Sequence, residues 1–295
     1  RRDVSTDGRR ATVAFTDDWA EDAARRDFRL NALYADTDGL ILDPTGAGYE
    51  DALAGRIVFV GEPEQRIRED YLRILRFYRF FAWYGRGAPD AAAVAACVAL
   101  AEGVERLSAE RVSKELLKLL AAPDPRAAVR LMDQAGVLGR VAPQPESLTL
   151  FEAMVEVSAD PVLRLSALLP DDAEAVRAAA LKLRLSNAQR DRLVEAVAER
   201  IDPTMSEAEA RVAIWRAGRQ AVEDRLYRAW ASGADVGAVQ RRLALAAAWT
   251  PPKLPVGGKD LARLGLAPGP QTGRLLKAFE AVSYTHLTLP TIYSV

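Results

Sequence analysis

Cysteine and histidine are almost absent from the chain, which has only Cys97 and His286 of these types in 295 residues. A disulfide framework is therefore excluded, and so is a zinc site built from several cysteine and histidine ligands. Catalysis of the serine–histidine or cysteine–histidine type would have to use His286. That residue lies in a terminal segment of unusual composition, and we expect no function there. Any chemistry must come from carboxylates, arginines and backbone groups.

Long apolar runs and an excess of one charge are also missing. No run approaches the ~20 apolar residues of a membrane span. Residues 1–4 contain neither an initiator Met nor the apolar core of a signal peptide. We therefore expect a cytoplasmic protein without membrane contacts, in a chain cut from a longer one. Lys and Arg number 40 against 41 Asp and Glu, so any RNA contact must come from a local basic patch.

The residue pattern changes from mixed to helical near Pro63. Before it, one helical segment (19–27) lies among short β-favouring runs at 11–15, 33–34, 40–42 and 57–60. After it, apolar residues recur every three to four positions over 64–84, 90–107, 109–121, 125–136 and about 150–248. A Pro- and Gly-rich stretch then precedes a final pair of short helices. The pattern predicts a mostly α protein with a smaller α+β part at its N-terminus.

We divide the chain into four parts on this pattern. The mixed part is residues 1–62, and two helical parts follow, residues 63–143 and 144–282, with a soft boundary at Gln144-Pro145. The last part, residues 283–295, is rich in Thr, Tyr and Ser instead of Ala, Arg, Leu and Glu. We interpret it as a non-native tail.

The segment 64–84 is predicted to be one helix with two faces. At ~100° per residue, its apolar face holds Ile67, Tyr71, Ile74, Leu75, Tyr78, Phe81 and Ala82. Its charged stripe holds Arg66, Glu69, Asp70, Arg73 and Arg76, with Arg68 and Arg79 pointing elsewhere. Taken alone, Asp70 and Arg73 are an ordinary surface pair that contributes ~0.2–0.5 kcal/mol.

Three short motifs give this pair a context. Residues 25–32 (RRDFRLNA) resemble the R-R-D-F-T-x-N-A motif of class II tRNA nucleotidyltransferases, the family of CCA-adding enzymes and bacterial poly(A) polymerases. Residues 43–51 (DPTGAGYED) resemble the D-P-x-G-G-x-x-D segment of that family, and residues 69–76 (EDYLRILR) resemble its E-D-x-x-R motif. Further similarity at 107–115 and 258–273 extends the resemblance to about residues 1–282.

The chain departs from the family pattern at two positions. Arg29 replaces a small hydroxyl residue, and Ala47 is inserted between two glycines, Gly46 and Gly48. The first change adds positive charge near the site, and the second changes the loop that carries the glycines.

The resemblance implies a fold and an activity. Residues 1–62 would be the remnant of an α+β nucleotidyltransferase palm, or head. Residues 63–143 would form a helical neck that recognises the nucleotide base, and residues 144–282 a helical body and tail that bind tRNA. The activity would be template-independent transfer of CMP and AMP from CTP and ATP to tRNA 3′ ends. The oligomeric state is left open.

The resemblance also implies roles for individual residues. Asp70 and Arg73 would read the base, because cytosine and adenine both present an amino donor beside a ring-nitrogen acceptor. Uracil and guanine reverse that order and would leave buried groups unpaired, at ~1–3 kcal/mol each. Phosphate, ribose and supporting contacts would come from Arg26 and Arg76 (phosphates), Asp27 (ribose) and Asn31 (local geometry or sugar).

The family's chemistry uses Mg²⁺ bound by a D-x-D pair, which activates the primer hydroxyl. We expect these ligands upstream of Arg1, since Asp17 and Asp18 occupy the wrong position, and we assign no metal ligand and no catalytic residue in this chain. We therefore expect the chain alone to add no nucleotides, although it retains weak affinity for ATP and CTP.

Candidate RNA contacts are basic residues on predicted helix surfaces. The strongest are Lys114, Lys118, Lys259, Arg263 and Arg274, and further ones are Arg126, Arg130, Lys182, Arg184, Arg241, Arg242 and Lys253. Each is alternatively a solvated helix residue. Two other functions stay open: a poly(A) polymerase or an enzyme restricted to C or A addition, and a non-catalytic helical RNA-binding protein, in which Asp70→Ala would leave nucleotide binding unchanged.

Overall fold

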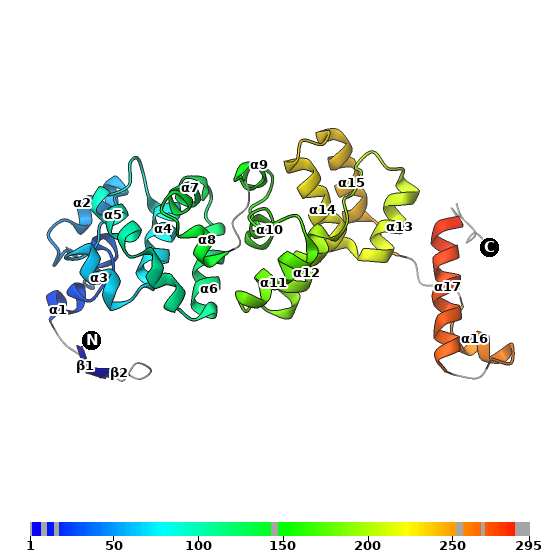
Figure 1. The fold of residues 1–295 in the computed structure, drawn as a ribbon, viewed down its shortest axis with the longest axis horizontal. Coiled ribbons are helices and arrows are strands. Elements are labelled where there is room, and N and C mark those ends of the chain that lie inside the picture. Colours follow the sequence, from blue (N-terminus) through cyan, green and yellow to red (C-terminus); the bar gives the residue numbers. More distant parts are fainter. Residues whose placement is uncertain are drawn as a thin grey trace. The chain divides into compact units, whose positions relative to one another are not determined.

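The computed structural model describes residues 2–6, 11–14, 18–142, 147–251, 256–266 and 269–286. The chain divides into two compact units, residues 1–190 and 191–295 (Figure 1), and each is described by itself. The predicted boundary at 143/144 lies outside the described residues, and so do residues 287–295 of the predicted non-native tail. These two assignments stay predictions.

The N-terminal part mixes short strands and helices, as predicted. Strands β1 (Arg2–Thr6) and β2 (Ala11–Ala14) pair antiparallel, and so do β3 (Tyr34–Ala35) and β4 (Ile41–Leu42). The second pair is the hairpin expected around Asp38-Gly39: Gly39 takes a φ of 84°, and the Asp36 carboxylate accepts from the backbone amides of Asp38 and Leu40.

Two expectations for this part were wrong. The helix expected over 19–27 is α1 (Trp19–Ala24), so residues 25–27 follow the helix. The run 57–60 forms no strand in the structure, because its backbone meets only the loop at Phe28, through one isolated bridge from Phe59. A 3-10 turn at Arg29–Asn31 and helix α2 (Gly48–Ala54) complete the region.

The single helix expected over 64–84 is two helices, α3 (Pro63–Glu69) and α4 (Leu72–Tyr84). Asp70 between them is extended, with φ −155° and ψ 105°, and its carboxylate accepts from the amide of Leu72 at 3.1 Å. An Asp side chain that binds backbone amides in this way favours a new helix start over continuation. The buried face of α4 therefore differs from the expected one: Leu72, Phe77 and Phe80 are buried, while Phe81 is only partly buried.

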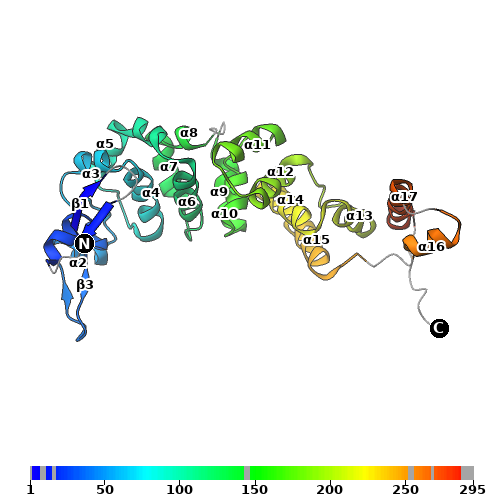
Figure 2. The same ribbon diagram turned by 90° about the horizontal axis from the view of Figure 1, so that it is seen from below.

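The rest of the first unit is helical, as predicted. Its elements are α5 (Ala91–Ala99), a 3-10 helix (Ala101–Arg106), α6 (Ala109–Leu120), α7 (Arg126–Gln134), α8 (Leu138–Val141), α9 (Thr149–Val157), α10 (Pro161–Ser166) and α11 (Ala173–Lys182). Helix α4 packs against both α6 and α7 (Figures 1 and 2), and α10 packs on α6 and α9.

An aromatic cluster joins the N-terminal part to α4. The ring of Phe28 lies 4.9 Å from the rings of Phe59 and Phe80, centre to centre, and 6.4 Å from that of Phe77. All four rings are buried. Each aromatic pair of this kind stabilises a fold by about 0.5–1.5 kcal/mol beyond the contribution of the apolar area that it buries. The cluster therefore fixes the loop that carries residues 25–28 against the middle of α4.

The second unit is also helical. It contains most of α12 (Asn187–Ala198) and all of α13 (Glu207–Ala217), α14 (Arg219–Ala231), α15 (Val236–Ala248), α16 (Gly258–Arg263) and α17 (Pro270–His286). Its core contains Ile214, Val222, Leu226, Val239 and Ala246. The mostly α fold class is confirmed. Among the helices that the structure describes, none combines the length and apolar character of a membrane span.

Candidate nucleotide-binding site

Arginines of α3 and α4 bind the segment 25–27, which lies forty or more residues earlier in the chain. Arg73 and Arg66 donate to the carbonyl oxygens of its first and second residues, at 3.3 and 2.7 Å. Arg76 donates to the carboxylate of its third residue, Asp27, from Nε at 2.6 Å. The structure thus brings together two of the motifs that the sequence singled out.

Asp27 is the most enclosed of the candidate residues, with 5% of its surface exposed. Its Oδ2 accepts from Arg76, and its Oδ1 accepts from the side-chain amide of Asn31 at 2.9 Å and from the backbone amide of Phe28 at 3.0 Å. The bond from Asn31 is consistent with one of its two predicted roles, support of the local geometry, and both roles stay predictions. Both carboxylate oxygens accept hydrogen bonds from protein donors. In the predicted ribose contact, a ribose hydroxyl would therefore donate to an oxygen that already accepts from the protein.

Arg26 lies at the surface beside Asp27, with 45% of its side chain exposed. It pairs with Asp22, one turn earlier at the start of α1, at 3.1 Å, and its guanidinium lies over the ring of Tyr34 at 5.8 Å. A hydrogen bond from the Tyr34 hydroxyl to Asp22, at 2.7 Å, and the pair with Arg26 hold the pKa of Asp22 well below its usual value. The i,i+4 spacing of Asp22 and Arg26 was the available sequence signal, but it is common on ordinary helix surfaces.

Asp70 and Arg73 are close in the chain but are bonded to other groups. Asp70 accepts from Arg111 of α6 at 2.7 Å and keeps 36% of its side chain exposed. Arg73 is 14% exposed and donates to Glu69 and to the carbonyl of Arg66, each at 2.6 Å. Burial opposes the ionisation of Glu69, but its bonds from Arg73 and Arg66 lower its pKa overall.

The predicted stripe is therefore only partly preserved. Because the chain is extended at Asp70, that residue does not lie one regular helical turn from Arg73, and its side chain turns toward α6. Arg73 instead donates to the carbonyl oxygen of Arg25, the residue before Arg26. Arg111 belongs to a segment that resembles a neck motif, but its pairing with Asp70 was not predicted.

The loop that carries the glycines is closed by Asp43. Its carboxylate accepts from the Thr45 hydroxyl at 2.6 Å and from the backbone amides of Thr45, Gly46 and Tyr49 at 3.1 Å each. Burial opposes the ionisation of the Asp43 carboxyl group, but the hydrogen bonds from Thr45 and the backbone lower its pKa overall. Gly46 takes a φ of 73°, and the inserted residue, Ala47, is the N-cap of α2.

Arg29, the other departure from the family pattern, has a carboxylate beside it. Its guanidinium lies 3.8 Å from the buried carboxylate of Asp51, which also binds Arg56 at 2.8 Å. The added positive charge is therefore balanced by α2. Arg29 and Thr45 also line a cavity of about 330 Å³ together with α1 residues and Gly61.

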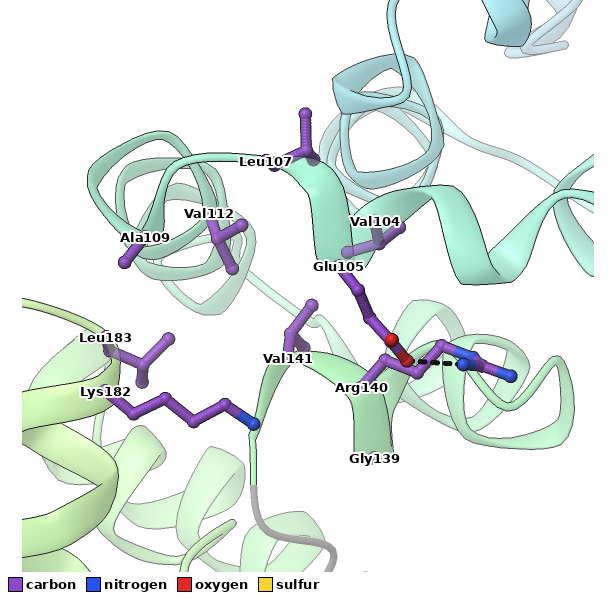
Figure 3. A pocket seen from close by; sticks show the side chains of 10 residues that line it. All are labelled: Val104, Glu105, Leu107, Ala109, Val112, Gly139, Arg140, Val141, Lys182 and Leu183. Atoms are coloured by element: carbon purple, nitrogen blue, oxygen red, sulfur yellow. Dashed lines mark hydrogen bonds and ion pairs between the residues drawn. The ribbon is translucent and has the colours of Figure 1, made fainter.

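A larger cavity of about 510 Å³ lies elsewhere in the first unit (Figure 3). Its wall combines apolar side chains with Lys182 and the Glu105–Arg140 ion pair. Its lining residues are Val104, Glu105, Leu107, Ala109, Val112, Gly139, Arg140, Val141, Lys182 and Leu183. The described residues that line these two cavities do not include Asp70, Arg73 or Arg76.

The described parts of the chain contain no group of three or more His, Cys, Asp or Glu side chains placed to hold a metal ion. Lone carboxylates such as Asp27 and Asp70 are bound to arginines instead. Because Mg²⁺ is usually bound by one or two carboxylates together with waters and substrate phosphates, we assign neither of these two carboxylates to a metal.

The candidate RNA contacts differ in availability. Lys114 and Lys118 are exposed on α6, and in the second unit Lys259, Arg263 and Arg274 are exposed, with Arg263 near Asp260 at 3.4 Å. Other candidates are engaged: Arg126 pairs with Asp124 and Glu156, Arg130 with Glu152, and Arg184 with Glu110. Lys253 lies outside the described residues.

Two sequence families match parts of the chain. Residues 1–58 match the family described as the poly A polymerase head domain. Residues 89–148 match the family described as the probable RNA and SrmB-binding site of polymerase A.

Individual relatives extend the similarity over most of the chain. The mitochondrial CCA tRNA nucleotidyltransferase 1 of Mus musculus is 31% identical over 292 residues, which cover 94% of this chain and 65% of the mouse protein. The Homo sapiens protein of the same name is 46% identical over 125 residues, 41% of this chain and 28% of the human protein. The chain thus spans less than two thirds of each of these relatives.

A solved structure gives the same picture. The CCA-adding enzyme of Bacillus stearothermophilus, in complex with CTP, aligns with a TM-score of 0.71 at 28% identity. The alignment covers 92% of this chain and 71% of that enzyme.

Proposed function

Because this chain belongs to the family of class II tRNA nucleotidyltransferases and poly(A) polymerases, we propose that it forms the nucleotide- and tRNA-binding part of a CCA-adding enzyme. Such an enzyme transfers CMP and AMP from CTP and ATP to tRNA 3′ ends without a template. The relatives named above support the choice within the family. The observation that carries the proposal is the attachment of Arg66, Arg73 and Arg76 to residues 25–27, since these bonds join the segment that carries Arg26 to the helix that carries Arg73 and Arg76.

The base would be read by Asp70 and Arg73. Asp70 is half-exposed and its partner Arg111 is also exposed, so the amino group of cytosine or adenine can compete for the carboxylate. Exposed ion pairs of this kind are worth only about 0–1 kcal/mol, which makes the exchange inexpensive. Arg73 would donate to the ring nitrogen from a guanidinium already fixed by Glu69 and by two carbonyls.

The phosphates would be bound by Arg26 and Arg76. Each guanidinium carries five N–H donors, and the ion pairs with Asp22 and Asp27 use only the Nε and Nη2 groups. The remaining donors suit phosphate oxygens, which a guanidinium can bind two at a time. Asp27 and Asn31 would set the position of Arg76 relative to the ribose.

We assign no metal ligand among the residues proposed to bind the nucleotide. Enzymes of this family use Mg²⁺, which when bound activates the attacking hydroxyl and stabilises the leaving pyrophosphate. We therefore give this part of the protein substrate recognition alone. tRNA is the second proposed partner, held in part by exposed lysines of α6 and basic residues of α16 and α17. A location in the cytoplasm stays a prediction.

Equilibrium binding of the four nucleoside triphosphates tests the proposal. We expect CTP and ATP to bind more tightly than UTP and GTP, and Asp70→Ala to remove that preference, because a mispaired base costs ~1–3 kcal/mol. Asp38→Ala, which removes a carboxylate at the exposed tip of the hairpin, is the matched control and should leave the preference intact. Equal binding of all four nucleotides by the unaltered chain would contradict the proposal.

The same titration separates the poly(A) polymerase branch, which the descriptions of both matching families name. That branch predicts that ATP binds and that CTP fails to displace it. Competition of CTP with ATP for one site supports CCA addition.

A further inference from the structure

Asp22 and Tyr34 surround Arg26 but belong to none of the motifs. Asp22 reaches it from α1, with Oδ2 accepting from Nη2 and Nε of Arg26 at 3.1 and 3.3 Å. Tyr34 reaches it from β3, with its ring below the guanidinium at 5.8 Å. The Tyr34 hydroxyl also donates to the same Asp22 oxygen at 2.7 Å, so the three side chains form a closed set of contacts.

The outer side of this set is also packed. The ring of Trp19 meets the ring of Tyr34 edge to face at 4.7 Å, which limits the rotation of Tyr34. Asp22 in addition accepts from Arg25 at 3.2 Å. Arg26 is therefore a surface side chain with one orientation supported by two elements, whereas an unsupported arginine samples many rotamers.

We propose that Asp22 and Tyr34 are positioning residues that hold Arg26 ready for the phosphate groups of the nucleotide. This inference rests on the proposed function, since it takes the ligand to be a nucleoside triphosphate. The clamp, meaning Asp22 and Tyr34, leaves Nη1 of Arg26 for the ligand. It also removes the entropy cost of ordering a long side chain at the moment of binding, which is the general advantage of preorganisation.

Because Asp22 is negatively charged, charge repulsion and positioning predict opposite changes in phosphate affinity when the charge is removed. A carboxylate next to a phosphate site repels the ligand, so its removal should tighten phosphate binding if repulsion were its only effect. Positioning predicts the opposite result. Asp22→Asn should weaken binding even though it removes a negative charge.

The experiment compares CTP with cytidine by calorimetric titration of the 295-residue chain. For Asp22→Asn we expect CTP affinity to fall about three- to tenfold, the range expected when one long side chain must be ordered on binding. The affinity for cytidine should stay within about twofold of its value for the unaltered chain, because cytidine has no phosphate for Arg26 to bind. Tyr34→Phe keeps the ring and loses the bond to Asp22, so it should give a smaller loss for CTP alone. The control Glu21→Gln removes the same charge from the adjacent position of α1 and should not weaken CTP binding.

The outcomes separate the two proposals. Unchanged or tighter CTP binding by Asp22→Asn overturns the positioning role, and so does an equal loss for CTP and cytidine, which would indicate a general structural defect. If Asp70→Ala removes base preference while Asp22→Asn has no effect, only the positioning role fails. If the unaltered chain binds CTP no better than cytidine, both proposals fail.

Discussion

Replacing Arg76 with methionine should destabilise the first unit, because it leaves the Asp27 carboxylate buried without its cation. Arg76 reaches Oδ2 of Asp27 from both Nε and Nη2, at 2.6 and 2.5 Å. Removing one partner of a fully buried ion pair costs about 3–5 kcal/mol. Arg76 is 29% exposed, and Asn31 and the Phe28 amide keep their bonds to Oδ1. We therefore expect a cost somewhat below that range, about 2–3 kcal/mol.

Thermal unfolding of the full chain, followed by circular dichroism, measures this cost. For a unit of 190 residues each kcal/mol shifts Tm by about 2–4 °C, so the first transition should fall by roughly 5–10 °C. The matched control is Arg68→Met on α3, whose exposed pair with Glu64 is worth about 0–1 kcal/mol. Equal shifts in the two variants would refute the reasoning. Adding Asp27→Asn to Arg76→Met should recover part of the loss, because a neutral amide needs no cation.

Four further predictions follow from the site. The bond from Tyr34 depresses the pKa of Asp22, so the stability that the Asp22 carboxylate contributes is present above about pH 4 and lost at lower pH. In urea titrations, the difference in free energy of unfolding between the unaltered chain and Asp22→Asn should therefore shrink as the pH falls toward about 2. Gly48→Ala should destabilise by about 1–3 kcal/mol, because its Cβ would lie 2.5 Å from the Arg29 carbonyl oxygen, whereas Gly258→Ala, with open space around it, should be neutral in the same titration. The 295-residue chain incubated with Mg²⁺, CTP and tRNA lacking its 3′ end should incorporate no labelled CMP, and incorporation would contradict the assignment of recognition alone. Binding of tRNA should weaken steeply with added salt, since phosphate contacts dominate such affinities; a flat response would argue against RNA binding.

Local patterns predicted the helices and the hairpin well. Apolar residues spaced by three or four positions indicated α6 and α7, and Asp38-Gly39 indicated the turn between β3 and β4. These features depend on residues that are near one another in the chain, so a single sequence contains the necessary information. The association of the 25–32 and 69–76 motifs came from the resemblance, and the bonds of Arg66, Arg73 and Arg76 agree with it.

Features that depend on distant contacts could not be predicted in this way. The end of α1 at Ala24 is one example: the carbonyls of Arg25 and Arg26, which follow it, accept from arginines forty or more residues away. Arg164 is another, since an arginine in an amphipathic segment normally indicates an exposed position. It is 2% exposed and donates to the carbonyls of Leu120, Ala122 and Ser158, where it satisfies the C-terminal ends of α6 and α9.

The single helix predicted over residues 64–84 is interrupted at Asp70, one of the candidate site residues. Apolar periodicity continues from Ile67 through Ile74, so the packing signal favours one helix. Asp70 overrides it by using its side chain as a cap for Leu72 and by taking an extended backbone. In a continuous helix its carboxylate would lie beside Arg73 and form a pair with it, leaving neither group for a ligand. Because the chain is extended there, Asp70 pairs with Arg111 and Arg73 pairs with Glu69 instead. The base reading that we propose for Asp70 and Arg73 therefore requires the ligand to compete with these partners.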